Sequence, residues 1–257
     1  MCLIIFALET HPLYKLVLIA NRDEFYHRPS LPAHFWEENR DILAGKDLER
    51  GGTWLGITKK GRFAAITNYR DPKNIRKDAP SRGELTANYL QGNTNPLKTM
   101  FQVQFKAQQY NGFNLLLGDP EDLFYYSNYA KSIQKVGQGI HGLSNHLLNT
   151  YWHKVGLGKE KLENYLKIHS ELEIEELLAL LEDESKPEDE KHIQQTGLPM
   201  EQEKILSPMF IRSKDYGTCS SSVLLWNRNN QITFAEKVFK NGKATQTQEF
   251  HFELETL

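Results

Sequence analysis

Short apolar runs separated by turn residues mark the start of the chain and predict two β-hairpins. Residues 2–8 are almost continuously apolar, a polar turn follows at 10–12, and residues 16–19 are apolar again. A second hairpin is predicted from residues 53–57 and 63–68. Because both arms of the first hairpin are apolar at successive positions, we expect these strands to be covered on both faces.

Helical periodicity appears in the middle of the chain. A helix is predicted from Asn95 to about Gln109, where Leu97, Phe101 and Phe105 recur at intervals of four. Further helices are predicted after S-x-x-E capping boxes at 81–84 and 170–173, and over 152–167.

The remaining pattern is one of short strands and two polar loops. Strands are predicted over 113–117, 123–126, 132–136, 139–143, 221–226, 232–239 and 248–254. Residues 25–47, with Pro29 and Pro32, and the charged segment 183–204 are predicted as loops. Strands grouped apart from helices indicate an α+β fold, with antiparallel sheets and helices outside.

Composition excludes several classes of protein. The hydrophobic residues make up 39% of the chain, which is enough for a folded core and argues against disorder. Lys and Arg number 31 against 33 Asp and Glu, and this near-neutral balance argues against a nucleic-acid or anionic-membrane surface.

The cysteines and apolar runs bear on location. Cys2 and Cys219 cannot form a disulfide framework, which favours a reducing compartment. The apolar run from Leu3 ends at Glu9, too short for a signal peptide, and no run approaches the length of a membrane span. We therefore expect a cytoplasmic protein without a transmembrane segment.

Cys2 is the most unusual position chemically. Initiator Met is generally removed before a small residue, and removal would leave a cysteine with both a thiol and a free α-amine. Both groups titrate close enough to neutral pH to serve as nucleophile and base. The structural alternative is a small buried residue that opens a core strand.

Four polar residues, 21–24, follow the second strand. A tight hairpin would return Arg22 and Asp23 to the neighbourhood of Cys2, where a carboxylate would hold the α-amine and a guanidinium would favour the thiolate. Strand alternation sends Arg22 and Asp23 to opposite faces, so both reach one site only where the strand ends or bulges. The alternative is a hairpin end in solvent.

Two asparagines are candidate oxyanion donors. Asn68 ends the fourth predicted strand, and Asn145 follows Gly142-Leu143-Ser144. A carboxamide at a strand end can donate a hydrogen bond to the oxyanion of acyl transfer. Each, taken alone, is also a common turn residue.

These fragments together resemble the NRDE family, also known as the transport and Golgi organisation family. The resemblance is carried by Met-Cys at the start, Asn21-Arg22-Asp23-Glu24, Arg50-Gly51-Gly52-Thr53-Trp54-Leu55-Gly56, Thr67-Asn68-Tyr69-Arg70, Ser81-Arg82-Gly83-Glu84-Leu85, Tyr110-Asn111-Gly112-Phe113-Asn114, Gly142-Leu143-Ser144-Asn145 and Tyr216-Gly217-Thr218-Cys219-Ser220-Ser221. The motifs span nearly the whole chain in order.

The resemblance implies a single domain over residues 1–257 with an N-terminal nucleophile (Ntn) hydrolase-like fold, a four-layer αββα sandwich. In the cysteine branch of such enzymes, which includes choloylglycine hydrolases and penicillin V acylases, Cys2 would match the nucleophile. Asn68 and Asn145 would match the two asparagines of that branch. Two departures stand out: Arg22 and Asp23 are adjacent rather than three apart, and Cys219 stands where an arginine is expected.

The first functional hypothesis is a thiol amidohydrolase for linear C–N bonds of a small-molecule amide. Cys2 would attack, Arg22 and Asp23 would support it, and Asn68 and Asn145 would stabilise the oxyanion. We predict that Asn21, Trp54, Tyr69 and Arg70 contact the substrate, although core packing is the commoner fate of such aromatic residues. No cofactor or metal is required.

The alternative is a non-catalytic carrier of haem or another hydrophobic metabolite, a role the resemblance also suggests. His27, His141 and His146 are among nine histidines, but no haem-attachment motif is present and no ligand is assigned. A third hypothesis, an interaction protein that docks through the acidic helix at 171–182, competes with a simple solvated helix. The sequence leaves the oligomeric state open.

Overall fold

The computed structural model describes residues 2–255, which divide into two compact units. The first unit comprises residues 2–27, 137–144 and 148–252, and the second comprises 28–136, 145–147 and 253–255. The single domain over 1–257 stays a prediction.

The first unit is built on a six-stranded sheet. Its strand order is β10 (Gly139–Leu143), β1 (Cys2–Leu8), β2 (Tyr14–Phe25), β11 (Tyr216–Asn227), β12 (Gln231–Lys240) and β13 (Lys243–Glu253). Neighbouring strands from β10 to β12 pair antiparallel. The chain thus places β1, with Cys2 at its start, next to β2 in the middle of the sheet.

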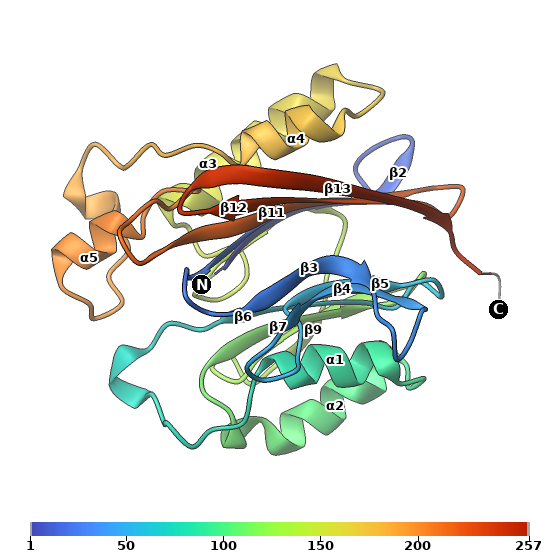
Figure 1. The fold of residues 1–257 in the computed structure, drawn as a ribbon, viewed down its shortest axis with the longest axis horizontal. Helices are drawn as coiled ribbons and strands as arrows, with labels where there is room; N and C mark the ends of the chain where they lie inside the picture. Colours follow the sequence, from blue (N-terminus) through green and yellow to red (C-terminus); the bar gives the residue numbers. More distant parts are fainter. Residues whose placement is uncertain (1, 256–257) are drawn as a thin grey trace. The chain divides into compact units, whose positions relative to one another are not determined.

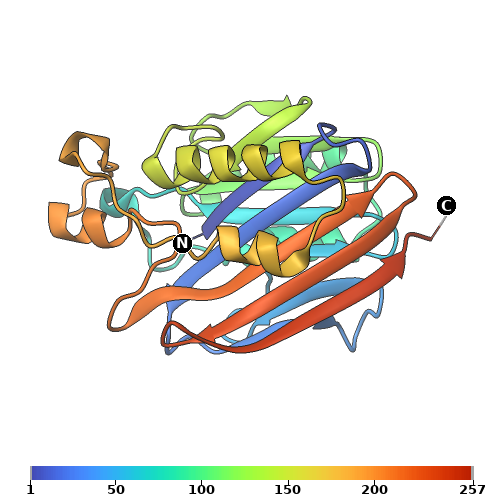
Figure 2. The same cartoon turned by 90° about the horizontal axis from the view of Figure 1, so that it is seen from above.

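Helices cover one face of this sheet. Figure 2 shows α3 (His153–Ile168) and α4 (Ile174–Leu180) lying across it. Leu3, Ile5 and Ala7, which alternate along β1, belong to the same buried cluster as residues of both helices. Since side chains alternate along a strand, Cys2 belongs to the opposite face. The unit also contains η3 (Glu190–His192) and α5 (Met200–Ile205).

The second unit is a seven-stranded antiparallel meander. Its strands follow chain order: β3 (Ser30–Phe35), β4 (Ile42–Asp47), β5 (Leu55–Thr58), β6 (Phe63–Asn68), β7 (Phe113–Gly118), β8 (Leu123–Ser127) and β9 (Ile133–Lys135). Helices α1 (Gly83–Gln91) and α2 (Pro96–Lys106) lie on one face (Figure 1) and share a buried core with β4, β6, β7 and β8. Short 3₁₀ turns, η1 (Pro72–Asn74) and η2 (Ala107–Gln109), complete it.

These observations confirm the α+β prediction with two antiparallel sheets, each with helices on one face. The predicted hairpins and the later short strands are all present, and several strands extend beyond their predicted ends. Among residues 2–255, no helix is long and apolar enough to cross a membrane.

The predicted loop at 25–47 is wrong, because it contains β3 and β4. The prolines in this segment were interpreted as evidence for a loop. In the structure, Pro32 lies in β3, an edge strand, at the point where the β3–β4 register shifts between Leu31 and His34. An edge strand with such an irregularity tolerates a residue that lacks an N–H. The charged segment 183–204 was likewise predicted as a loop and includes η3 and the start of α5.

Both predicted capping boxes are also wrong. The N-cap of α1 is Arg82 rather than Ser81, and α4 begins after Glu173 without a side-chain cap. The Glu84 carboxylate instead accepts a hydrogen bond from the Tyr110 hydroxyl. The cap of α2 is real, since Asn95 Oδ1 accepts from the Lys98 N–H over 2.8 Å.

Two of the glycine-containing motifs meet in the second unit. A Cβ on Gly52 would lie 2.5 Å from the carbonyl carbon of Gly83, so only glycine allows this approach. The Thr53 N–H donates to the Gly83 carbonyl over 3.2 Å. The Gly-Gly-Thr motif thus fixes the start of α1 against the loop before β5.

Candidate active site

The β1–β2 ladder places Cys2 directly opposite Arg22. Residues that face each other in an antiparallel pair project to the same side of the sheet, so the thiol and the guanidinium share a face. β2 continues regularly to Phe25, and alternation therefore sends Asp23 to the other face. The expected bulge lies not in β2 but in its neighbour β11.

Asp23 is held by β11. The Thr218 hydroxyl donates to Asp23 Oδ1 over 2.8 Å, and the same hydroxyl oxygen accepts the Ile211 N–H over 2.9 Å. The Tyr216 hydroxyl donates to the Asp23 carbonyl over 3.0 Å. Asp23 and Thr218 are both fully buried. Because the Ile211 N–H occupies the Thr218 oxygen, the hydroxyl hydrogen is directed at the carboxylate.

Cys219 is the extra residue of a β-bulge. Thr218 pairs with Asp23 and Ser220 with Arg22, which leaves Cys219 between them without a partner in the ladder. Its Sγ lies 3.6 Å from the Glu24 carbonyl and 3.5 Å from the Gly217 carbonyl. The cysteine at this position therefore contacts the backbone of the 21–24 quartet.

Burial governs the ionisation of both thiols. Cys2 is 8% exposed, and its burial raises the pKa of the thiol to about 11. The negative charge of Asp23 contributes to this increase in pKa, and the positive charge of Arg22 opposes it. Burial also raises the pKa of Cys219, with Arg22 again acting in the opposite direction. A reaction through Cys2 near neutral pH therefore needs a base that takes the thiol proton.

Asn21 ties loops to the sheet. Its Nδ2 donates to the carbonyls of Leu181 (3.0 Å) and Met209 (2.9 Å), and its Oδ1 accepts from the Ser221 hydroxyl over 2.6 Å. The side chain is fully buried, and both amide hydrogens are engaged. This geometry gives Asn21 a structural role, and its predicted contact with a substrate stays a prediction that these bonds do not support.

In the second unit, the two candidate oxyanion donors lie together. Asn145 Nδ2 donates to the Asn68 carbonyl over 3.0 Å, and Asn145 Oδ1 accepts from Arg70 Nη2 over 3.2 Å. The Arg70 N–H donates to the Asn145 carbonyl over 2.8 Å. Asn145 is fully buried. The carboxamide of Asn68 makes no hydrogen bond among the described residues.

The predicted aromatic contacts have different surroundings. Tyr69 stacks on Tyr129 with ring centroids 3.9 Å apart and shares a 2.9 Å hydrogen bond with His146. Burial lowers the pKa of His146, which favours the neutral ring. Trp54 is partly buried and packs against the core beneath α1 and α2.

Two residues that the sequence reasoning did not single out have the firmest polar networks. One is Thr218. The other is Asn114, fully buried, which donates to Thr67 Oγ1 (3.1 Å) and the His146 carbonyl (2.9 Å) and accepts from the Tyr125 hydroxyl. Both lie in motifs that carried the family resemblance, which was the available signal.

The structure thus groups Cys2, Arg22 and Asp23 in the first unit, and Asn68, Arg70 and Asn145 in the second. The assignment of these residues to one active site stays a prediction.

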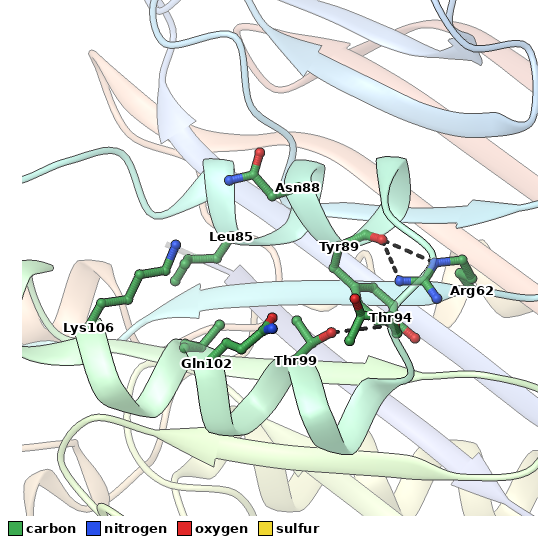
Figure 3. A pocket seen from close by; sticks show the side chains of 9 residues that line it. Arg62, Leu85, Asn88, Tyr89, Thr94, Thr99, Gln102 and Lys106 are labelled. Atoms are coloured by element: carbon green, nitrogen blue, oxygen red, sulfur yellow. Dashed lines mark hydrogen bonds between the residues drawn. The ribbon is translucent and has the colours of Figure 1, made fainter.

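A small polar pocket lies between α1 and α2 in the second unit (Figure 3). Its volume is about 110 Å³, and its walls include Arg62, Asn88, Thr99, Gln102 and Lys106. Arg62 donates through Nε and Nη2 to the Tyr89 carbonyl near the end of α1, over 3.1 and 2.7 Å. Its guanidinium is therefore occupied by the helix end, and none of the predicted site residues lines this pocket.

Among residues 2–255, no group of three or more His, Cys, Asp or Glu could hold a metal ion. His141 engages both ring nitrogens, with the Gly137 carbonyl at 2.9 Å and Asn149 Nδ2 at 3.1 Å.

Comparison with known proteins places these features in a family. A family model described as Transport and Golgi organisation 2 matches residues 1–241. The chain is 34% identical to the Transport and Golgi organization protein 2 homolog of Bos taurus, over 96% of both chains. It is also 34% identical to the Homo sapiens homolog, over the full length of both.

A solved structure shows the fold. A mutant conjugated bile acid hydrolase from Clostridium perfringens superposes with a TM-score of 0.51 and 8% sequence identity, over 97% of this chain and 92% of the other. This similarity confirms the Ntn-hydrolase-like fold class.

Proposed function

Because the chain belongs to the Transport and Golgi organisation 2 family and shares the Ntn-hydrolase fold, we propose that it is a thiol amidohydrolase that uses Cys2. The substrate class is a small linear amide. The observation that carries the proposal is the register of β1 and β2, in which Cys2 stands opposite Arg22 at the start of the sheet.

The chemistry begins with removal of Met1, which frees the Cys2 α-amine as a base. The amine takes the thiol proton while sulfur attacks the amide carbonyl carbon, so a C–S bond forms and a tetrahedral oxyanion results. The C–N bond then breaks, and the ammonium returns its proton to the leaving amine. Water then gives a proton to the same α-amine and attacks the thioester carbonyl carbon. The C–S bond breaks, the acid is released, and the ammonium returns its proton to the sulfur.

The charged neighbours support this cycle. Arg22 lowers the pKa of the Cys2 thiol, whereas Asp23 raises it, so both charges act on the sulfur. A carboxylate held by Thr218 is suited to keeping an α-ammonium in place during the step in which it carries the proton. We therefore propose Asp23 as the group that orients the amine, and Arg22 as the group that favours the thiolate.

The two asparagines would serve the oxyanion. Asn68 would donate through its uncommitted carboxamide, and Asn145 is the buried side chain that joins the Asn68 carbonyl to Arg70. Their participation, like that of Trp54, Tyr69 and Arg70 in substrate binding, is part of the proposal. No cofactor is required, and a reducing cytoplasm would keep the thiol available.

The test begins with the N-terminal residue of the purified protein, read by mass spectrometry. Protein that begins at Cys2 is incubated with a panel of N-acyl amides, and the released amine is quantified. Acid quenching should trap an acyl group on the Cys2 peptide. Cys2→Ala should abolish both signals, while Cys219→Ala should retain them.

Two results would overturn the proposal: turnover by protein that retains Met1, or turnover that survives Cys2→Ala. The carrier hypothesis is measured in parallel by titrating haem into the wild type and into both variants. A saturable shift of the Soret band without amide turnover by any substrate would favour the carrier.

A further inference from the structure

The outward face of α2 is apolar. Leu97, Phe101 and Phe105 recur at intervals of four along the helix. They are 39%, 57% and 96% exposed, while Met100 and Val103 are buried against the sheet. Successive residues of a helix turn by about 100°, so the two phenylalanines project opposite the buried side.

Basic side chains surround this apolar ridge. No acidic residue occurs between Glu84 and Asp119, while α2 itself carries Lys98 and Lys106. Lys73 lies in η1, and Ile75, which is 66% exposed, Arg76 and Lys77 follow it in the chain. Arg76 is bound to Gln108 and Gln109, just after α2. We call these basic residues and Ile75, with Leu97, Phe101, Phe105 and Lys131, the α2 face.

Hydrogen bonds fix this neighbourhood. Arg76 Nη2 donates to the carbonyls of Gln108 (2.9 Å) and Gln109 (2.5 Å), and Asn111 Nδ2 donates to the Arg76 carbonyl over 2.9 Å. Gln104 Nε2 donates to the Lys131 carbonyl over 2.9 Å. The loops that flank α2 are therefore tied to its C-terminal end, and the face is presented as one surface.

The lysine side chains of the α2 face form no hydrogen bond among the described residues, whereas the Arg76 guanidinium binds the carbonyls of Gln108 and Gln109. Among the described residues, none of its six Lys and Arg side chains forms an ion pair. The nearby acids are Asp71, which accepts from Tyr129 and Asn74, and Asp78. The whole-chain charge of −2 hides this local excess of positive charge, because the average over the molecule does not report how charges are distributed.

We propose that the α2 face docks on an anionic lipid bilayer, with Phe101 and Phe105 inserted among the headgroups. Helices that bind the surface of an anionic membrane typically carry aromatic side chains that insert at the interface and lysines that bind the lipid headgroups. A protein partner fits less well, since lysine is depleted in protein interfaces, and this ridge is convex, with only a few protruding apolar side chains. A fluid surface needs no matching groove.

Vesicle co-sedimentation tests the proposal with the full chain. We expect sedimentation with phosphatidylcholine vesicles that contain phosphatidylserine, little with phosphatidylcholine alone, and weaker binding at high salt. Lys98→Gln and Lys106→Gln should each lower the partition coefficient about fivefold. The double variant Phe101→Gln/Phe105→Gln should lower it by roughly tenfold or more. Ile168→Gln, which changes an equally exposed apolar residue at the end of α3, is the matched control and should bind as the wild type does.

Insertion has its own readout. Phe105→Trp should give indole fluorescence that shifts to the blue on addition of the anionic vesicles and is quenched by brominated lipid. Three results would overturn the proposal: wild type that stays in the supernatant at low salt, unchanged binding by the double phenylalanine variant, or a concentration-dependent dimer that this variant abolishes. The last would make a second copy of the chain the occupant.

Discussion

Thr218 donates its hydroxyl hydrogen to the buried carboxylate of Asp23 and is itself fixed by the N–H of Ile211. The two residues lie on neighbouring strands, yet 195 positions separate them in the sequence. Because of this hydrogen bond, the side-chain conformation of Asp23 depends on β11 as well as on β2.

The Thr218–Asp23 bond can be tested by a matched pair of variants. Thr218→Val keeps the shape but removes the donor to Asp23 and the acceptor for Ile211, so it should destabilise the protein by about 1–3 kcal/mol. Thr218→Ser restores both groups and should recover most of that loss. Urea denaturation measures the difference, and equal stability of the two variants would contradict the role assigned to the hydroxyl.

The two charges beside Cys2 should change its reactivity in opposite directions. Burial is the main cause of the raised pKa of the thiol, about 11, to which Asp23 adds and which Arg22 opposes. Arg22→Gln should therefore raise the pKa and slow alkylation by iodoacetamide at pH 8, whereas Asp23→Asn should lower the pKa and accelerate it. Below the pKa, the rate should rise about tenfold per pH unit.

Mass spectrometry of the Cys2 peptide measures these rates, in a Cys219→Ser background that removes the second thiol. The comparison is made between proteins with the same N-terminal residue. Changes of the same sign in both variants would show that packing, rather than charge, controls the sulfur.

Alanine variants of Asn145 and Asn68 should affect stability and activity differently. Asn145→Ala removes a donor to the Asn68 carbonyl and an acceptor for Arg70 inside the protein, and should cost about 1–3 kcal/mol of stability. Asn68→Ala removes a carboxamide without a partner among the described residues, so stability should change by less than about 0.5 kcal/mol.

If Asn68 is an oxyanion donor, its alanine variant should lower kcat about 100- to 1,000-fold while KM changes little. Denaturation and steady-state kinetics on the same preparations give both numbers. A large loss of stability in Asn68→Ala, or full activity, would argue against this assignment.

The adjacent glycines Gly51 and Gly52 should differ in how well they tolerate substitution by alanine. A Cβ on Gly52 would meet the Gly83 backbone at 2.5 Å, whereas one on Gly51 meets nothing within 4 Å and only opposes a φ of +70°. Gly51→Ala should cost about 1–2 kcal/mol of strain. Gly52→Ala should reach the upper end of about 1–3 kcal/mol or exceed it, because backbone must move. Thermal unfolding ranks the two, and the reverse order would contradict the close approach.

Much of the fold was predictable because alternation and turn residues are local signals. The hairpin from Cys2 to Phe25 and the final strands follow from them. Strands β3 and β4 were missed because Pro29 and Pro32 also suit an irregular edge. The period of four in residues 97–105 correctly predicted a helix, but it does not identify the side of α2 that is buried.

The site was predictable only in part. Cys2, Arg22 and Asp23 lie on the two strands of one hairpin. The position of the turn was therefore enough to predict that Cys2 is next to Arg22 and Asp23 in the sheet. Thr218 could not be inferred, because the partner of Asp23 depends on which distant strand pairs with β2 and in what register. The single active site, the cytoplasmic location and the absence of a cofactor stay predictions.

The bulge in β11 has a consequence for how related sequences are compared. Shortening the strand by the one extra residue would restore a regular ladder and turn every side chain before it to the opposite side of the sheet. The threonine would still be present, but it would face away from the aspartate that it now anchors. A homologue that lacks the bulge residue but keeps the residues before and after it would therefore still lack the hydrogen bond between the threonine and the aspartate.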